Sequence, residues 1–430
     1  MGRKEKEAFV FLLLMLLLTF QTCSAASNTQ QPKRRESLSV SSSSSSNSPG
    51  SSVFPIFGNV YPAGLYYISV SIGNPPKKYF LDIDTGSDLT WVQCDAPCVS
   101  CYDGPHPPYK PARNKLVFCK DPLCPAVPSL IPYTCEEPHD QCDYQITYAD
   151  GGFSDGVLVR DTFSLRMSSG SLAQPSLTFG CGYNQGGSSS ISTRMTDGVL
   201  GLGNGKSSIL SQLRGLNLVR NVIGHCISGQ GGGYLFFGDS IIPSSGVTWT
   251  PMSRNRFQKY SPGPMNIIFG KQPIGVKDLL VVFDSGSTYT YLASRPYQAF
   301  VSTLKKSLSG KPLKEVSEDE DETLSLCWKG SRWFKSILEV KEYFKPLILI
   351  FANGKKATLE IPLEGYLIIS WHGNVCLGIL NGSEAGLQDL NVIGDISLQD
   401  LMVIYDNEKQ KIGWVRENCN RLPTSGTAFF

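Results

Sequence analysis

The sequence has little of the side chains and motifs on which several large enzyme classes depend. It contains only four histidines among 430 residues, and no P-loop, H-E-x-x-H motif or dinucleotide-binding fingerprint occurs. The segment Phe237–Ile241 (FGDSI) lacks the glycines that follow the serine of a chymotrypsin-like site. These absences argue against nucleotide-dependent enzymes, zinc proteases and chymotrypsin-like serine proteases.

An excess of charge of one sign is also lacking. Lys and Arg number 39 and Asp and Glu 37, so the net charge is +2 and nothing global indicates a nucleic acid partner. The apolar run Phe9–Phe20 is too short for a comfortable membrane span, and no other stretch reaches about 18 apolar residues. This run follows a basic start and precedes small residues near Ala25, which is the pattern of a secretory signal peptide. We expect residues 1–25 to be removed, with a signal anchor as the competing interpretation.

Export has consequences for the product and for the segment that follows. After signal removal we expect a soluble protein without membrane contact, either extracellular (including the cell wall) or vacuolar. Residues 26–55 are polar, with the serine run Ser41–Ser46, and offer too little apolar surface to fold alone. They are expected to form a propeptide, as in a zymogen, or a disordered linker.

Cysteine usage agrees with export. Removal of Cys23 with the signal leaves 12 cysteines, an even number that predicts six disulfides. The cluster Cys94–Cys101 (CDAPCVSC) could be half of a zinc site, but no Cys/His pair follows it at ligand spacing. We therefore expect no metal and no other cofactor. Paired cysteines also make a cysteine protease improbable.

The remaining sequence predicts an all-β fold. From about Gly64, short runs rich in Val, Ile, Tyr and Phe alternate with Gly, Pro, Asn and Asp at intervals typical of strands and turns. Only Ser207–Leu216 and Ser294–Leu308 show the amphipathic pattern of helices. The acidic segment Glu315–Glu322 is expected to be a solvated loop.

A repeat divides this β region. Asp84 in FLDIDTGSDLTWV and Asp284 in FDSGST each follow an apolar run, and each is followed by a hydroxyl residue, a glycine and a serine. Later in each half an apolar run closes on glycine, in Asp197–Gly203 (DGVLGLG) and Asn391–Asp395 (NVIGD). We expect two homologous lobes, residues 56–243 and 244–430, with the functional site at their junction.

The two aspartates permit a specific chemistry. Either tripeptide alone could be a simple turn, in which Asp accepts backbone hydrogen bonds and Gly takes a positive φ. Two carboxylates meeting in a water-poor cleft, however, cannot both ionise cheaply and share one proton. The ionised member can then take a proton from water while the other polarises a peptide carbonyl. The neighbouring residues would hold the carboxylates or let substrate approach: Thr85, Gly86, Ser87, Ser285, Gly286, Ser287 and Thr288.

The ordered set FLDIDTGSDLTWVQC, YADGGFSDG, FGCGYNQGG, DGVLGLG, VVFDSGST and NVIGD resembles the pepsin-type aspartic endopeptidases, in particular the plant nucellin-like and nepenthesin-like branch. The resemblance covers roughly residues 64–415. It implies a bilobal β fold, a monomer, polypeptide substrates with apolar side chains near the cut, and acid activity. It also implies that Asp84 and Asp284 are catalytic, that Tyr148 closes a flap over substrate, and that Trp91 hydrogen-bonds Tyr148.

The same resemblance supplies expectations that the residues alone leave open. It implies the disulfides Cys94–Cys98, Cys101–Cys181, Cys119–Cys142, Cys124–Cys135, Cys226–Cys419 and Cys327–Cys376. A rival function comes from the same branch, which includes proteins resembling secreted xylanase inhibitors that keep the fold and lose a catalytic residue. The sequence also has one N-glycosylation sequon, at Asn381.

Overall fold

The computed structural model describes residues 49–98, 101, 103–127, 135–137, 139–186, 195–253, 258–317, 319–352 and 357–423. The expected signal peptide and most of the expected propeptide lie outside these residues. The chain divides into two compact units, residues 1–47 and 48–430, and all the described residues belong to the second.

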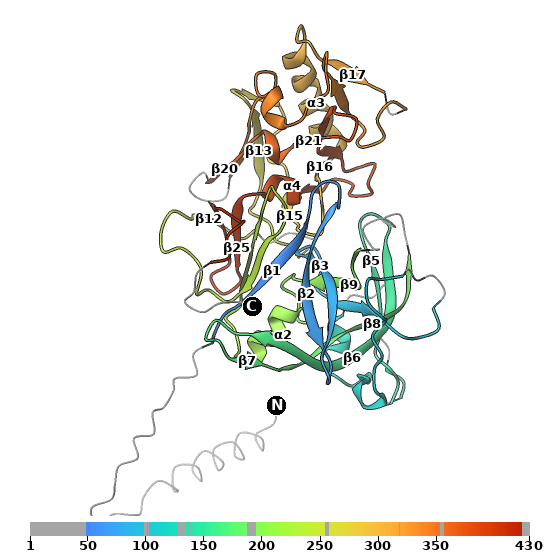
Figure 1. Ribbon diagram of the computed structural model, residues 1–430. Coiled ribbons are helices and arrows are strands. Elements are labelled where there is room, and N and C mark those ends of the chain that lie inside the picture. Colours follow the sequence, from blue (N-terminus) through green and yellow to red (C-terminus); the bar gives the residue numbers. More distant parts are fainter. Residues whose placement is uncertain are drawn as a thin grey trace, which may run out of the picture. The chain divides into compact units, whose positions relative to one another are not determined.

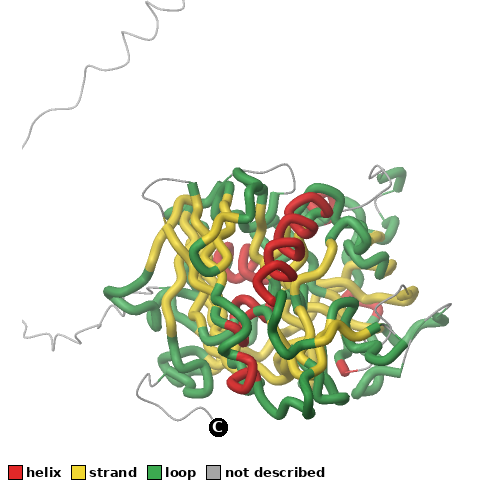
Figure 2. The backbone as a smooth tube through the Cα atoms, turned by 90° about the horizontal axis from the view of Figure 1, so that it is seen from above, coloured by secondary structure: helices red, strands yellow, loops and turns green. Residues whose placement is uncertain are grey.

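Short strands dominate this unit and helices are few, as the sequence predicted (Figures 1 and 2). The strands of the first half are β1 Ser52–Asn59, β2 Leu65–Ile72, β3 Lys77–Asp84, β4 Trp91–Gln93, β5 Asp143–Thr147, β6 Phe153–Arg166, β7 Leu172–Ala173, β8 Ser176–Gly186, β9 Gly198–Gly201, β10 Val222–Ile227 and β11 Gly233–Phe237. Those of the second half are β12 Thr248–Pro251, β13 Met265–Phe269, β14 Gln272–Pro273, β15 Val281–Phe283, β16 Thr290–Leu292, β17 Lys314–Val316, β18 Cys327–Lys329, β19 Leu347–Phe351, β20 Ala357–Ile361, β21 Leu367–Ile369, β22 Val375–Leu377, β23 Ile379–Asn381, β24 Asn391–Ile393, β25 Leu401–Asp406 and β26 Lys411–Arg416. The helices are α2 Ile209–Gly215, α3 Ser294–Leu308 and α4 Asp395–Leu398, with 3-10 turns at Arg113–Lys115, Cys124–Ala126, Ile337–Val340 and Leu363–Gly365.

The internal repeat is visible in the strand pairing. In the first half, β3 lies parallel to β9 with Asp84 opposite Gly201, and β4 runs antiparallel to β9. In the second half, β15 lies parallel to β24 with Phe283 opposite Ile393, and β16 runs antiparallel to β24. Both halves therefore use the same arrangement. Each aspartate loop lies at the end of a strand that pairs in parallel with the apolar, glycine-terminated run of its own half.

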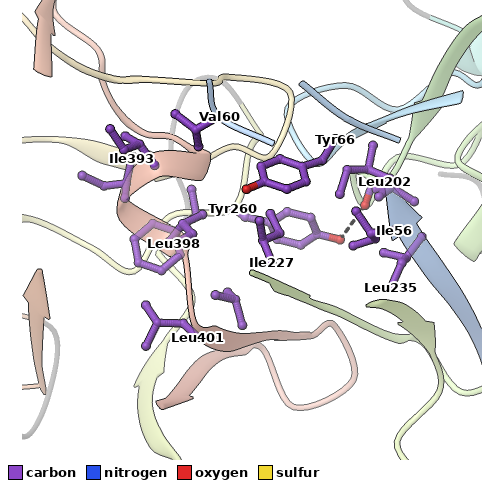
Figure 3. Close-up of a cluster of buried hydrophobic side chains, with 14 of the residues drawn as sticks. Ile56, Val60, Tyr66, Leu202, Ile227, Leu235, Tyr260, Ile393, Leu398 and Leu401 are labelled. Atoms are coloured by element: carbon purple, nitrogen blue, oxygen red, sulfur yellow. Dashed lines mark hydrogen bonds between the residues drawn. The ribbon is translucent and has the colours of Figure 1, made fainter. Parts of the chain in front are cut away.

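A large sheet joins the two halves. Its strand order contains β12-β26-β25-β10-β11-β1, so strands from the end of the chain pair directly with β10 of the first half. The disulfide Cys226–Cys419 crosses the same junction. Buried side chains from both halves meet above this sheet, including Tyr66 and Ile227 of the first half and Tyr260, Leu398 and Leu401 of the second (Figure 3). The Tyr260 hydroxyl donates to the Leu202 carbonyl at 3.2 Å, which satisfies its polar atom inside this core.

Two local expectations need correction. Strand β1 begins at Ser52, so residues 52–55 belong to the fold although the sequence assigned them to the polar propeptide or linker. The acidic segment is not wholly a solvated loop either, because β17 takes up its first residues and Asp321 is 1% exposed. The Asp321 carboxylate accepts hydrogen bonds from Ser370 Oγ at 2.6 Å and Asn374 Nδ2 at 2.8 Å, and these bonds compensate its burial.

The described residues contain six disulfides, the number predicted from the cysteine count. The pairs Cys226–Cys419 and Cys327–Cys376 are confirmed, but the other four expected pairs are wrong. The structure instead contains Cys94–Cys181, Cys98–Cys101, Cys119–Cys135 and Cys124–Cys142.

Strand pairing and packing explain the difference. Because β4 lies parallel to β8 with Val92 opposite Cys181, the Cys94 amide donates to Gly182 O at 2.8 Å, and Cys94 rather than Cys101 meets Cys181. Likewise Cys124 and Cys142 are buried in the same small apolar cluster, which joins them to each other.

Candidate active site

Asp84 ends β3, whose alternate apolar side chains are buried, and Asp284 follows β15, which is buried throughout. Val281, Val282 and Phe283 of β15 and Leu81 and Ile83 of β3 are at most 1% exposed. The strands must end where the polar turn begins, because the hydroxyl, glycine and serine residues bond the carboxylate instead of continuing a ladder. Each carboxylate is thus carried at the end of a rigid element rather than on a mobile loop.

The two carboxylates have matching sets of donors. Gly86 N donates to Asp84 Oδ1 at 2.7 Å, and the Ser87 hydroxyl donates to Asp84 Oδ2. In the other loop, Gly286 N donates to Asp284 Oδ1 at 3.0 Å and Ser287 Oγ donates to Asp284 Oδ2 at 3.1 Å. These bonds fix the orientation of both side chains.

The loops bring the carboxylates together across the junction of the halves. A β-carbon added at Gly86 would lie 2.5 Å from Asp284 Oδ1, and one added at Gly286 would lie 2.5 Å from Asp84 Oδ1. Each carboxylate therefore occupies space that any side chain at the opposite glycine would fill. The glycines are needed here so that the two carboxylates can approach closely. The sequence repeat had predicted only that the site lies at the junction of the lobes.

Thr85 and Ser285 lock the loops to one another. Thr85 N donates to Ser285 Oγ at 3.1 Å and Ser285 N donates to Thr85 Oγ1 at 2.9 Å. Their hydroxyls donate in turn to backbone carbonyls of the opposite strand, Thr85 Oγ1 to Phe283 O at 3.4 Å and Ser285 Oγ to Ile83 O at 2.9 Å. This buried network holds the two halves of the site at a fixed separation.

The electrostatics of the site favour retained protons. Burial, and then the charge of Asp284, raise the pKa of Asp84 above its usual range, while Lys259 and the bonds from Ser87 and Gly86 partly oppose this rise. Burial followed by the charges of other carboxylates also raises the pKa of Asp82 and of Asp395. Asp84 can therefore keep its proton beside a second carboxyl, which the shared-proton chemistry expected from the sequence requires.

The predicted flap is formed by the β5–β6 hairpin. Tyr148 N donates to Gly152 O at 2.7 Å across its turn, and the expected side-chain bond is present, with Trp91 Nε1 donating to Tyr148 Oη at 2.7 Å. Burial, and then the charge of Asp84, raise the pKa of Tyr148. The Tyr148 hydroxyl therefore lies close enough to Asp84 to interact with its charge. A β-carbon on Gly386 would lie 3.0 Å from Ala149 O, so the tip of the flap lies against the loop that follows β23.

The remaining predicted residue, Thr288, is engaged elsewhere. Its hydroxyl donates to the Gly64 carbonyl in the β1–β2 connection, which ties the second aspartate loop to the first half. Substrate binding by Thr288 stays a prediction.

Sequence reasoning missed three charged neighbours of the dyad: Asp82, Lys259 and Asp395. The period-two alternation of β3 could have identified Asp82, since residues 82 and 84 share a face. Asp395 could have been noticed as the end of NVIGD. No local pattern marks Lys259.

A metal is not required by any of these contacts. In the described part of the chain, the atoms of Asp321, Cys327 and Cys376 lie close enough together to suggest a cation site, but both cysteines belong to one disulfide. No helix among the described residues is both long and apolar enough to cross a membrane.

Comparison with known proteins places this geometry in a family. Two family models match, the N-terminal xylanase inhibitor domain over residues 66–239 and the C-terminal xylanase inhibitor domain over residues 272–416. The chain is 49% identical over 391 residues to an aspartic proteinase of Oryza sativa subsp. japonica, covering 88% of this chain and 94% of that protein. It is 27% identical to aspartic proteinase 36 of Arabidopsis thaliana, covering 83% of this chain and 74% of that protein.

Solved structures share the fold at low identity. Basic 7S globulin from soybean superposes with a TM-score of 0.65 at 18% identity, covering 88% of this chain and 100% of that chain. The aspartic proteinase from Irpex lacteus gives a TM-score of 0.59 at 17% identity, covering 87% and 99%. The two-lobed β architecture predicted from the repeat is confirmed.

Proposed function

Since the chain belongs to the plant branch of the pepsin-type aspartic proteinases, we propose that it is an active endopeptidase that hydrolyses peptide bonds of polypeptides at acid pH. The observation that carries the proposal is the approach of Asp84 and Asp284, each oriented by its own loop and each facing the glycine of the other. No cofactor takes part in the proposed reaction.

The proposed reaction uses one shared proton. A water between the carboxyls loses a proton to the ionised aspartate as its oxygen attacks the peptide carbonyl carbon, while the protonated aspartate donates to the carbonyl oxygen. When the tetrahedral intermediate collapses, its C–N bond breaks, the aspartic acid formed in the first step protonates the leaving nitrogen, and a diol hydroxyl gives its proton to the other aspartate, which restores the shared-proton state. Thr85 and Ser285 act as positioning residues because their bonds set the separation of the loops. Tyr148 would close over the substrate from the flap.

The pH dependence follows from the sign of the pKa changes. Because the pKa of Asp84 is raised, the pair keeps its proton to higher pH than an isolated aspartate would. Activity should be lost as rising pH removes that proton, and again at low pH when both carboxyls are protonated. A bell-shaped profile on the acid side is therefore expected.

A non-catalytic binding protein is the second candidate function. It is favoured by the descriptions of the two matching family models and by the likeness to basic 7S globulin from soybean. Against it, both aspartates are present with complete sets of donors, and the flap tyrosine keeps its bond to Trp91. This arrangement supports the enzyme over the binding protein.

The proposal includes export and processing. Residues 1–25 would be removed as a signal and the following segment as a propeptide, giving a monomer in the extracellular space or vacuole. Asn381 at the end of β23 would carry a glycan. Its Nδ2, the atom to which a glycan is attached, donates to Glu384 Oε1 at 2.7 Å, so attachment would have to precede this contact. Intact-mass measurement of the secreted protein tests both cleavage and occupancy.

The decisive experiment is cleavage of a quenched peptide and of denatured haemoglobin between pH 3 and 8. Wild type, Asp84→Asn, Asp284→Asn and the exposed-surface control Glu360→Gln would be compared with and without pepstatin. Acid activity in wild type and the control, absent from both aspartate variants and blocked by pepstatin, supports the enzyme. Absence of activity from folded, processed wild type would favour the binding protein.

A further inference from the structure

One acidic side chain of the cleft has no role in the proposed reaction. Asp82 lies two residues before Asp84 in β3, and because side chains alternate along a strand, the two project from the same face. Tyr79, Leu81 and Ile83 on the opposite face are at most 1% exposed and form core, whereas Phe80 and Asp82 are only partly buried. Asp82 is therefore a lining residue beside the dyad and not a core residue.

Aromatic rings continue the surface away from Asp82. Tyr67 of β2 is directly opposite Asp82, and Phe57 of β1 is directly opposite Tyr67, so the three form one row across the sheet. The Tyr67 ring lies 5.7 Å from that of Phe57 and 5.0 Å from that of Phe80. Phe57 is 46% exposed. A carboxyl thus stands at the inner end of a partly open aromatic row.

Electrostatic interactions with two parts of the site indicate where Asp82 lies. The charges of Asp84 and Asp284 both act on its carboxyl, and its charge in turn acts on the Tyr148 hydroxyl of the flap. Asp82 therefore lies near both the two aspartates and the Tyr148 hydroxyl of the flap hairpin. Within the described residues no lysine or arginine forms an ion pair with it.

We propose that Asp82 selects a cationic side chain, lysine or arginine, at a substrate residue flanking the scissile bond. The inference rests on the proposed endopeptidase function and names its substrate class. Strand geometry puts Asp82 about 7 Å along β3 from Asp84, within reach of a long side chain whose own carbonyl sits at the dyad. The carboxylate would pair with the cation, and Tyr67 and Phe57 would contact the methylene stem and the charged group.

A substrate cation also answers an electrostatic problem of the free site. A third carboxyl near the dyad is costly to ionise, because burial and two like charges oppose it. A bound ammonium or guanidinium favours the ionised form and replaces the lost solvation with a charge-assisted hydrogen bond. An apolar side chain in the same place would leave Asp82 without a cationic partner. The apolar preference expected from the family resemblance would then not hold for this residue of the substrate.

The test uses paired peptides that differ at one residue flanking the cut, lysine in one and norleucine in the other, so that both side chains have a four-carbon stem and only lysine carries the ammonium group. With wild type we expect kcat/KM to be about tenfold or more higher for the lysine peptide. With Asp82→Asn the preference should fall to about unity, mainly through loss on the lysine peptide. Glu360→Gln, which removes an exposed charge on β20, should keep the wild-type preference.

A binding measurement separates this inference from the proposed function. The same peptides, labelled with a fluorophore, would be titrated by anisotropy into Asp284→Asn and into the double variant Asp82→Asn/Asp284→Asn. Tighter binding of the lysine peptide to the first and equal binding to the second support selection by Asp82, even if the wild type proves inactive. A wild type that prefers norleucine, or an unchanged lysine preference in the double variant, overturns the inference.

Discussion

The buried histidine beneath the site should limit stability in acid. His225 in β10 is 0% exposed, and its Nε2 lies 3.2 Å from the Tyr405 hydroxyl of β25. Burial lowers the pKa of His225 from 6.5 to about 3. Between these values the unfolded chain binds a proton that the folded chain does not, so stability falls as pH falls. The loss begins below about pH 6.5 and is complete near pH 3.

The size of this effect can be worked out and measured. At about 1.36 kcal/mol per pH unit below the pKa of the unfolded histidine, acidification to pH 4 should cost about 3 kcal/mol. We expect His225→Gln to escape this loss. The free energy of unfolding would be measured in urea at pH 7.5 and pH 4, with disulfides intact, for wild type, His225→Gln and the exposed control His139→Gln.

The comparison between variants isolates the histidine. Carboxyls with raised pKa values, such as Asp84, gain stability on acidification, but they are common to all three chains and cancel in the difference. Wild type and His139→Gln should lose about 3 kcal/mol more than His225→Gln between the two pH values. Parallel curves for wild type and His225→Gln would refute the reasoning.

Three further outcomes are expected. Asp84→Asn should raise the free energy of unfolding at pH 7.5 by about 1–3 kcal/mol and lose this advantage towards pH 4, because the raised pKa of Asp84 makes its ionised form destabilising only near neutral pH. Urea titration at both pH values tests this, and a gain of equal size at pH 4 would contradict it. Lys259→Met should move the alkaline limb of kcat/KM to higher pH, since Lys259 lowers the pKa of Asp84; an unmoved limb would show that this charge does not reach the dyad. Thr85→Val removes the acceptor of Ser285 N and should lower the free energy of unfolding by about 1–3 kcal/mol at any pH, because it leaves a buried donor unsatisfied. Thermal melts would compare it with the exposed hydroxyl control Ser169→Ala, and equal melting temperatures would contradict this explanation.

The sequence predicted the parts of this structure that depend on local pattern. Alternating apolar residues and turn residues indicated strands. The repeat around Asp84 and Asp284 indicated two halves, because each half has the same sequence of apolar strand and aspartate turn. The pairing of Cys94 with Cys181 could not be read in the same way. It depends on which strand lies beside β4, a choice made by tertiary packing rather than by cysteine spacing.

In the candidate site too, the sequence predicted the local motifs but not the contacts made by tertiary packing. Gly86 and Gly286 were expected to allow close approach, but the sequence did not indicate that each accommodates the opposite carboxylate. Lys259 comes near the dyad from a segment with no motif of its own, so only the folded chain reveals it. Asp82 belongs to the same motif as Asp84, but an acid that alternates with buried apolar residues in a strand resembles an ordinary solvent-facing residue, so the sequence did not mark it.

The pairing of β25 with β10 has a consequence for biosynthesis. During translation, β10 leaves the ribosome long before Leu401, the first residue of β25, has been added. Until then the sheet below the aspartate loops lacks this strand, and the Asp284 loop, although already synthesised, lacks β24, which pairs with β15 only after residues 391–393 have been added. The nascent chain therefore carries only half-sites, and a competent dyad can arise only after nearly all of the protein has been synthesised. For the proposed endopeptidase, this order of assembly would protect the growing polypeptide from premature cleavage.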